Sequence, residues 1–334
     1  MNYWSNKKIL ITGGAGFIGS NLTERLVFLG NKVRVIDNLE RGKKKYLKSV
    51  LTDIEFLPLD LRQKEACITA CKDIEIVFHL ASKVGGIGYY LNKPGEVILE
   101  NSLIDTLMLS ASLECNVERY LYASSAHVYP IELQLTPDAA PIKEKQALPA
   151  NPELSYGWAK LLAEKQIEYY IAEGHELRVS IVRLIGVFGK NQDIDLETGS
   201  AIPVFCRRAI EYPDLKPFII RGTGKETRSY CYIDNVIDGM LISVEKLDDR
   251  QLIGPLNLGS EGCIAIDRLA RMVIEISGKL IDLQLNTSKA TTIWGQTVDC
   301  TKAKELLDGW TPKISLYEGL QRTYEDVENR LSIL

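Results

Sequence analysis

The sequence lacks the features that mark nucleic-acid-binding and membrane-spanning proteins. Its 40 Lys and Arg residues are offset by 44 Asp and Glu residues, and a formal charge of −4 provides no positive field that would hold a polyanion. No apolar run approaches the roughly 18 to 20 residues that cross a bilayer. Glycines follow Lys7 and Lys8 where a signal peptide would have its apolar core. We therefore expect neither nucleic acid nor a membrane as a partner.

Histidine is scarce, and cysteine does not occur in a metal-binding pattern. The chain has three histidines, and its seven cysteines are odd in number and lie mostly within apolar periodic segments. Cys67 and Cys71 would share a helix face, but no set of four ligands has a recognised metal-binding spacing. Scattered thiols of this kind are typical of a reducing compartment. The pattern predicts a cytoplasmic protein that binds no metal.

Hydrophobic periodicity in the first half of the chain predicts a parallel sheet. Short β-branched runs alternate with amphipathic segments, which is the pattern of a sheet with helices on both faces. The predicted strands are residues 8–12, 32–37, 54–58, 76–80, 120–124 and 178–184. The predicted helices are residues 17–29, 63–71, 97–116 and 152–173.

A glycine cluster follows the first predicted strand. Gly13, Gly16 and Gly19 stand where the strand turns into a helix whose N-terminal amides can face a pyrophosphate. Asp37 closes the second predicted strand, where a carboxylate can accept hydrogen bonds from a ribose. The same carboxylate would repel the extra phosphate of NADP, so the combination predicts NAD as the cofactor.

Asp60 and Leu61 follow the third predicted strand and could reach the adenine edge. The alternative interpretation is a glycine-rich turn without a cofactor, followed by an ordinary surface Asp37. The strand, the spacing and the helix together favour the cofactor site over this alternative.

The cofactor motif gives the expected division of the chain. Beyond Arg183 the regular alternation breaks into loops rich in Gly, Asp and Pro, while segments near Asn235 and Asn257 look able to return to the main sheet. We predict an α/β protein with a Rossmann-type doubly wound parallel sheet and a smaller, interleaved C-terminal substrate-binding lobe. The expected NAD-binding domain is 1–185, completed by about 229–259, and the lobe is 186–228 and 260–334.

Tyr156 and Lys160 are one turn apart on one face of a predicted helix. A nearby ammonium lowers the pKa of a phenol from about 10, so the pair can act as a general acid/base. Three other tyrosines have a lysine at the same spacing: Tyr3, Tyr89 and Tyr212. Tyr156 differs from them because it begins a helix after the strand that ends in Ser124 and Ser125, whose hydroxyls would face the nicotinamide.

In this order the motifs resemble those of the extended short-chain dehydrogenase/reductase family. The matching segments are TGGAGFIG, Asp37-Asn38, His79-Leu80-Ala81, Ser124-Ser125 and Tyr156-x-x-x-Lys160. The resemblance implies an NAD-dependent enzyme that acts on a nucleotide-diphosphate sugar.

In that family Tyr156 would take the proton of a sugar hydroxyl, usually at C4, while hydride passes to NAD. Ser125 would bind that hydroxyl, and Lys160 would hold the tyrosine and the nicotinamide ribose. The further cofactor residues implied are Phe17, Ile18, Asn38, Leu80, Ala81 and Ser82.

Further segments resemble the GDP-mannose 3,5-epimerases and, around Lys83, the GDP-fucose synthases. The segments are residues 81–88, 122–130, 205–209 and 222–230. This resemblance implies a GDP-sugar whose diphosphate pairs with Arg208 and Arg228, and a homodimer built on the helices predicted at 97–116 and 152–173. It also places Lys83, Gly85 and Gly86 among the substrate-binding residues. Asp37 argues against the NADPH that the fucose synthases use.

Four positions of the substrate site depart from that pattern. His127 stands where these relatives carry a catalytic cysteine, and Ser200 stands where they carry lysine or histidine as a second acid/base. Gly186 replaces an asparagine that touches the substrate, and Trp294 lies near the place of a nucleotide-binding arginine. A serine cannot protonate a carbanion as a lysine can. His127, which could titrate near neutrality, is therefore the candidate for a single acid/base, and the alternative is that it only caps the loop after the strand.

The leading hypothesis is an epimerase that oxidises C4 transiently and then returns the hydride. One alternative is a 4-dehydrogenase or 4,6-dehydratase that releases the 4-keto sugar. Another is a non-catalytic NAD-binding protein that has kept the fold. The intact set of Ser125, Tyr156 and Lys160 disfavours the non-catalytic alternative.

Overall fold

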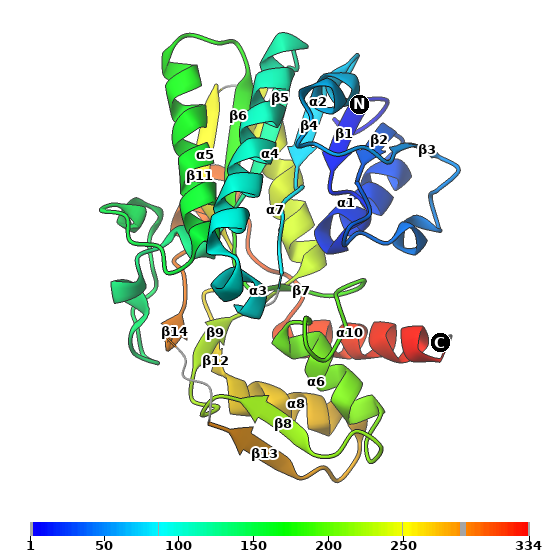
Figure 1. Cartoon of the computed structure of the whole chain (residues 1–334), viewed down its shortest axis with the longest axis vertical. Helices are drawn as coiled ribbons and strands as arrows, with labels where there is room; N and C mark the ends of the chain where they lie inside the picture. Colours follow the sequence, from blue (N-terminus) through cyan, green and yellow to red (C-terminus); the bar gives the residue numbers. More distant parts are fainter. Residues whose placement is uncertain (1–2, 86, 249, 288–291, 333–334) are drawn as a thin grey trace.

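A seven-stranded parallel sheet forms the centre of the molecule (Figure 1). The structure is a computed structural model that describes residues 3–85, 87–248, 250–287 and 292–332. The strand order is β11-β6-β5-β4-β1-β2-β3. The strands are β1 (Lys8–Thr12), β2 (Lys32–Ile36), β3 (Ile54–Leu57), β4 (Ile76–His79), β5 (Arg119–Ser125), β6 (Arg178–Leu184) and β11 (Leu252–Leu258). The α/β class, the parallel sheet and all six predicted strands are confirmed.

Helices cover both faces of this sheet because its strands carry apolar side chains on both faces. In β1, Ile9 and Ile11 belong to one hydrophobic core and Leu10 belongs to a second one. The first core is closed by α1 (Phe17–Phe28) and α7 (Ile233–Glu245), and the second by α2 (Lys64–Cys71), α4 (Pro94–Glu114) and α5 (Ser155–Ala172). No helix among the described residues is long and apolar enough to cross a membrane.

The four predicted helices are present, and two of them begin three residues away from the predicted first residue. The helix predicted from residue 97 begins at Pro94, because proline is well tolerated in the first turn of a helix. The helix predicted from residue 152 begins at Ser155 instead, because Pro152 forms a β-bridge with Pro130. The short helix α3 (Ile87–Asn92) was not predicted.

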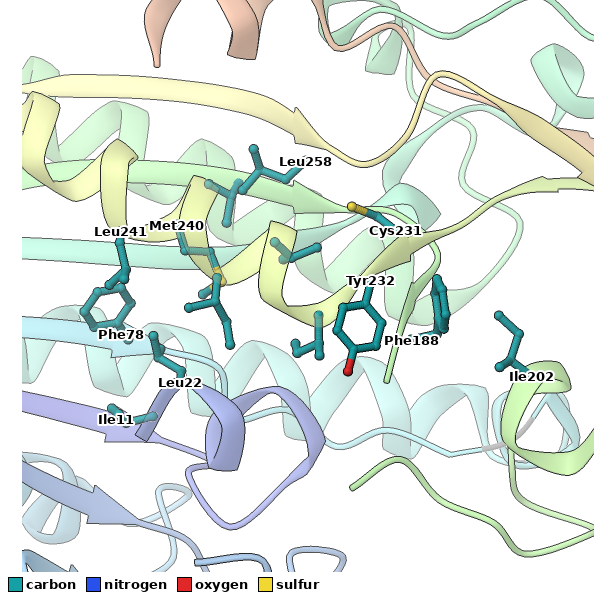
Figure 2. Close-up of a cluster of buried hydrophobic side chains, with 14 of the residues drawn as sticks. Ile11, Leu22, Phe78, Phe188, Ile202, Cys231, Tyr232, Met240, Leu241 and Leu258 are labelled. Carbon is teal, nitrogen blue, oxygen red and sulfur yellow. The ribbon is translucent and has the colours of Figure 1, made fainter. Parts of the chain in front are cut away.

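The chain after β6 forms a smaller lobe below the sheet in Figure 1 and returns to the sheet through α7 and β11. Figure 2 shows one hydrophobic core running from Ile11 and Phe78 of the sheet to Tyr232 and Ile202 of the lobe. The remaining elements after β6 are β7 (Val187–Phe188), α6 (Ala201–Ile210), β8 (Phe218–Arg221), β9 (Thr227–Ser229), β10 (Cys231–Tyr232), β12 (Cys263–Ala265), α8 (Ile266–Ser277), β13 (Leu283–Asn286), β14 (Gly295–Gln296), α9 (Thr301–Leu306), which contacts β11, and α10 (Leu316–Leu331). The 3-10 helices are η1 (Lys44–Leu47), η2 (Ala126–Val128), η3 (Ile131–Gln134), η4 (Glu144–Ala147) and η5 (Lys246–Asp248). The division into a cofactor domain and a substrate lobe stays a prediction.

A buried ion pair attaches α5 to the sheet. Arg183 of β6 donates from Nε and Nη2 to the two carboxylate oxygens of Glu164, at 2.9 and 2.6 Å. Ser124 of β5 donates to the same carboxylate at 2.5 Å. Both charged side chains are at most 3% exposed, and removing one partner of such a pair typically costs about 3–5 kcal/mol. The pair therefore fixes the helix that carries Tyr156 against the ends of β5 and β6.

Candidate active site

A cleft of about 300 Å³ lies at the carboxyl edge of the sheet, where ligands bind in open α/β folds. Its walls come from the loops that follow β1 to β4, from the ends of β5 and β6, and from residues of α1, α4 and α5. Every residue predicted to bind the cofactor lines this cleft. They are Gly13, Gly16, Phe17, Ile18, Gly19, Asp37, Asn38, Asp60, Leu61, Leu80, Ala81, Ser82, Tyr156 and Lys160.

The glycines of the first loop are required by close backbone contacts. Gly13 has a φ of +66°, and a Cβ there would lie 2.9 Å from the Cα of Ala81. A Cβ at Gly19 would lie 2.2 Å from the carbonyl oxygen of Gly13. Gly16 caps the N-terminus of α1, whose first turn carries no acidic side chain. These residues fit the pyrophosphate of a dinucleotide, because a helix N-terminus offers backbone N–H groups and a positive dipole end to an anion.

Asp37 is oriented by the backbone around it. Its Oδ2 accepts a hydrogen bond from the Ala15 amide at 3.0 Å, and its Oδ1 accepts one from the Leu39 amide at 2.9 Å. Burial raises the pKa of Asp37 above its ordinary value, against the two hydrogen bonds, which lower it. Each carboxylate oxygen can still accept a second hydrogen bond. The arrangement suits a pair of ribose hydroxyls.

A network of ion pairs lies at the other wall of the cleft, and most of it was not found from the sequence. Lys83 pairs closely with Glu40. Arg62 pairs with Asp60 at 2.5 Å and with Glu100 at 3.0 Å. The Arg62 hydrogen bonds outweigh burial and hold the pKa of Asp60 below its ordinary value. Charged residues on loops and helix surfaces are ordinary features, so only Asp60 and the resemblance around Lys83 pointed to this network.

Tyr156 lies at the nicotinamide end expected for the cleft. Its phenol forms hydrogen bonds with the hydroxyls of Ser82 and Ser125. Ser82 donates in turn to Asn101 Oδ1 at 2.5 Å. Burial raises the pKa of Tyr156 well above its ordinary value, although both serine hydrogen bonds lower it. Lys160 Nζ lies 5.9 Å from the centroid of the Tyr156 ring. The predicted Ser-Tyr-Lys set is thus brought together in one place.

His127 lies beside Tyr156, with 5.9 Å between the ring centroids. Burial, together with the charge of Arg228, lowers the pKa of His127 to about 4. This direction differs from the expectation that His127 titrates near neutrality, and its causes are burial of the ring and the charge of Arg228. Its backbone amide donates to Ser125 Oγ at 3.2 Å, while its ring makes no hydrogen bond to any described residue. The neutral ring is available as a proton acceptor.

Arg228 and Trp294 lie on the same side as His127. Arg228 donates to the carbonyl oxygens of Thr227 at 2.8 Å, Ile293 at 2.9 Å and Trp294 at 3.5 Å. Neither residue lines the 300 Å³ cleft, and the same is true of Ser125 and His127. The structure thus places Ser125 and His127 beside Tyr156 and Arg228 near His127, all outside the cofactor cleft.

Other residues predicted to bind substrate lie apart from this group. Arg208 donates to the Pro217 carbonyl oxygen at 3.2 Å. Ser200 is exposed at the N-terminus of α6, where its hydroxyl accepts a hydrogen bond from Gln192 at 2.9 Å. Neither of them lines the cleft.

The predicted glycines differ in their surroundings. A Cβ at Gly186 would lie 1.9 Å from the Ser229 carbonyl oxygen, so this backbone excludes the asparagine of the relatives. Gly85 packs against Tyr89. Gly86 lies outside the described residues.

The chain matches the model of the NAD dependent epimerase/dehydratase family over residues 9–259. The GDP-mannose 3,5-epimerase of Arabidopsis thaliana is 32% identical over 325 residues, which cover 96% of this chain and 83% of that protein. UDP-glucuronic acid decarboxylase 5 of the same plant is 31% identical over 334 residues, covering 98% of this chain and 92% of that protein. The UDP-glucose 4-epimerase of Thermotoga maritima, solved with UDP-glucose, has a TM-score of 0.84 and 28% identity, with 98% and 99% of the chains covered. MoeE5, solved with UDP-glucose and NAD, has a TM-score of 0.81 and 26% identity, with 98% and 100% covered.

We predict that Asp37→Ala weakens NAD binding and narrows the preference for NAD over NADP. A hydrogen bond to a charged acceptor contributes about 1.5–3 kcal/mol, which corresponds to a loss of roughly 10- to 150-fold in affinity. Calorimetric titration of both dinucleotides measures the effect. Asp53→Ala is the control, because Asp53 is exposed and lies outside the cleft. Tighter binding of NADP than of NAD by the unmodified protein would contradict the assignment of Asp37.

Proposed function

Because this chain belongs to the NAD dependent epimerase/dehydratase family, we propose that it is a nucleotide-sugar epimerase that oxidises C4 of the sugar transiently and then returns the hydride. The observation that carries this proposal is the position of the Tyr156 phenol, beside Ser125 and Lys160 at the end of the cofactor cleft. A GDP-sugar is the favoured substrate, since the GDP-mannose 3,5-epimerase of Arabidopsis thaliana is 32% identical to this chain. Seven free cysteines support the cytoplasm as its compartment.

The side chains around Tyr156 suit a proton transfer at a sugar hydroxyl. NAD, when bound, supplies the acceptor and donor of the hydride. Ser125 hydrogen-bonds the sugar hydroxyl and aligns it with the phenol of Tyr156. Tyr156 takes the hydroxyl proton and gives it back after the hydride returns. Lys160, buried on the same helix face, holds the nicotinamide ribose and stabilises the phenolate.

The second half of the reaction depends on His127 and Ser200. A 4-keto sugar has acidified protons at C3 and C5, and a neutral imidazole beside Tyr156 is able to accept one of them. Ser200 is exposed on α6 and is not an acid/base of useful strength. The proposed enzyme therefore inverts C4 alone, or inverts one neighbouring carbon after the transient oxidation at C4.

Tyr156→Phe should lower turnover on the order of 100-fold or more, because it removes the proton acceptor and keeps the ring that packs in the site. Steady-state kinetics measures the loss, and circular dichroism checks that the fold is unchanged. Tyr212→Phe is a matched control, because Tyr212 has the same spacing to a lysine but lies outside the cleft. Full activity in Tyr156→Phe would move the catalytic assignment to another tyrosine.

The reaction outcome is tested with GDP-, UDP- and dTDP-sugars, including a uronic acid, in deuterium oxide with NMR of the products. We expect deuterium at one of C3 and C5, lost in His127→Asn, or at neither carbon if only C4 is inverted. The reason is that hydride passes between C4 and NAD without meeting water. Deuterium at both carbons would instead indicate a full 3,5-epimerase. A net gain in NADH absorbance would indicate release of an oxidised sugar.

The enzyme is proposed to be a homodimer formed through α4 and α5. These neighbouring helices expose large apolar side chains on one surface: Ile98, Leu99, Leu103, Trp158, Leu162 and Tyr169. Between 37% and 69% of each residue is accessible in the single chain. A second copy, packed across a two-fold axis, would cover this surface with an identical one and form a four-helix seam.

We predict that the double variant Leu99→Glu/Leu162→Glu is monomeric. A dimer of this variant would have to bury four carboxylates at the two-fold seam. Light scattering coupled to size-exclusion chromatography measures the mass. Leu280→Glu is the control for added charge, since Leu280 is 98% exposed and lies far from these helices in the sequence. A monomeric unmodified protein, or a double variant that stays dimeric, would rule out this seam.

A further inference from the structure

Asp105 is a buried carboxylate in the middle of α4 that no motif identified. Its side chain is 1% exposed, as is that of Lys160, and its Oδ1 lies 3.5 Å from Lys160 Nζ. A charge at this depth is costly unless it is paired and hydrogen-bonded. The pair therefore needs a structural or chemical explanation.

Two further donors hold the Asp105 carboxylate. Tyr122 of β5 donates its hydroxyl to Oδ2 at 2.7 Å, and His79 Nε2 lies 3.0 Å from Oδ1. The tautomer of His79 follows from its other nitrogen, which lies 2.8 Å from Thr12 Oγ1. That oxygen already accepts the amides of Leu80 and Ala81 at 3.0 Å each. Its own hydroxyl must therefore donate to His79 Nδ1, which leaves the ring proton on Nε2 to bind Asp105.

The charge states are consistent with this geometry. Burial alone would raise the pKa of Asp105, but the charge of Lys160 and the hydrogen bonds from His79 and Tyr122 hold it below its ordinary value. Burial lowers the pKa of His79, so its ring is neutral. Asp105 is thus ionised, and it forms a compact pair of opposite charges with Lys160.

We propose that Asp105 is a positioning residue that holds Lys160 through this ion pair, offsets its positive charge, and thereby sets the pH at which Tyr156 can take a proton. The proposal rests on the role of Tyr156 in the proposed function. A free ammonium would stabilise the phenolate strongly, whereas a closely paired ammonium acts at a distance only as a dipole. In agreement with this, burial and then Asp105 raise the pKa of Tyr156, whereas its hydrogen bonds with Ser82 and Ser125 lower it.

The other titratable groups around the pair add no net charge, so the Asp105–Lys160 pair sets the electrostatic effect on the ionisation of Tyr156. The nearby tyrosines are uncharged at neutral pH, and burial lowers the pKa of both nearby histidines, so their rings are neutral as well. The charge of Glu164 is balanced by Arg183. The titratable and charged groups that face Lys160, Asp105 or Tyr156 are Tyr90 of α3, His79 of β4, Tyr120 and Tyr122 of β5, His127 of η2, and Glu164 of α5 with Arg183 of β6.

The same bonds connect Lys160 to the cofactor cleft. They run from Lys160 through Asp105, His79 and Thr12 to the amides of Leu80 and Ala81, and both of these residues line the cleft. Lys160 is therefore fixed in place before any ligand binds. A lysine held in this way loses little side-chain freedom when it receives the ribose.

The test is the ionisation of Tyr156 in the NAD-loaded protein. It is followed by the ultraviolet difference spectrum, with Tyr156→Phe in each background to isolate this phenol. Asp105→Asn keeps the shape of the side chain and removes its charge. We expect the midpoint for Tyr156 to fall on the order of one pH unit or more. Because the phenolate is the base, the acid limb of kcat/KM should move to lower pH by the same amount. An unchanged or higher midpoint in Asp105→Asn would overturn the proposal.

Two further variants separate charge from structure. Tyr122→Phe removes a hydrogen bond from the same carboxylate without changing its charge, so its Tyr156 midpoint should not fall. The double variant Asp105→Asn/Lys160→Met removes both charges, avoids an unpaired buried ion and should return the midpoint close to that of the unmodified protein. A double variant that titrates like Asp105→Asn would also refute the proposal. The titration needs no sugar and therefore tests the role of Asp105 independently of the reaction. It remains informative even if the kinetics of Tyr156→Phe contradict the proposed function.

Discussion

The attachment of α5 to the sheet is the constraint on which the catalytic end depends. Tyr156, Lys160 and Glu164 follow one another at intervals of four residues, and all three are buried along one face of this helix. Glu164 is anchored to Arg183 of β6, and Lys160 is anchored to Asp105 of α4. Two ion pairs one turn apart therefore fix both the height and the rotation of the helix. Tyr156, one turn further toward the N-terminus, is placed at the carboxyl edge of the sheet as a consequence.

The sequence was sufficient for the sheet and the cofactor loop because both depend on local patterns. A strand buried on both faces needs a run such as Ile9-Leu10-Ile11, and the contacts at Gly13 and Gly19 leave no room for a side chain. It was insufficient for Asp105, which meets a lysine 55 residues away. The only local signal was an acid on the same helix face as Val97, Asn101 and Met108, all of them buried. The pKa of His127 likewise depends on Arg228, which belongs to the lobe.

The elements after β6 were harder to predict from the sequence because they are short and are held by tertiary contacts. β7 and β10 have two residues each, too few for a period-2 pattern to emerge. Gly186 and Ser200 were recognised as departures from the relatives, yet the reason for the glycine, a carbonyl oxygen of Ser229 against its Cα, is visible only in the fold. A scaffold can keep its cofactor loop unchanged while the substrate residues vary, since function is determined by the site and not by the fold.

The two ends of the site differ in how their charged side chains are paired. At the cofactor end the strong charges are already paired within the protein, Lys160 with Asp105, Arg62 with Asp60 and Lys83 with Glu40. Arg228 differs, because its hydrogen bonds go to backbone carbonyl oxygens and it forms no ion pair with a described residue. A half-buried guanidinium that has Glu226 and Glu153 nearby but pairs directly with neither favours an anion such as the proposed sugar diphosphate. The charge of Arg228 is also one of the two causes that lower the pKa of His127. Pairing Arg228 with a diphosphate would remove that second cause and leave burial, the larger one, to keep the ring of His127 neutral.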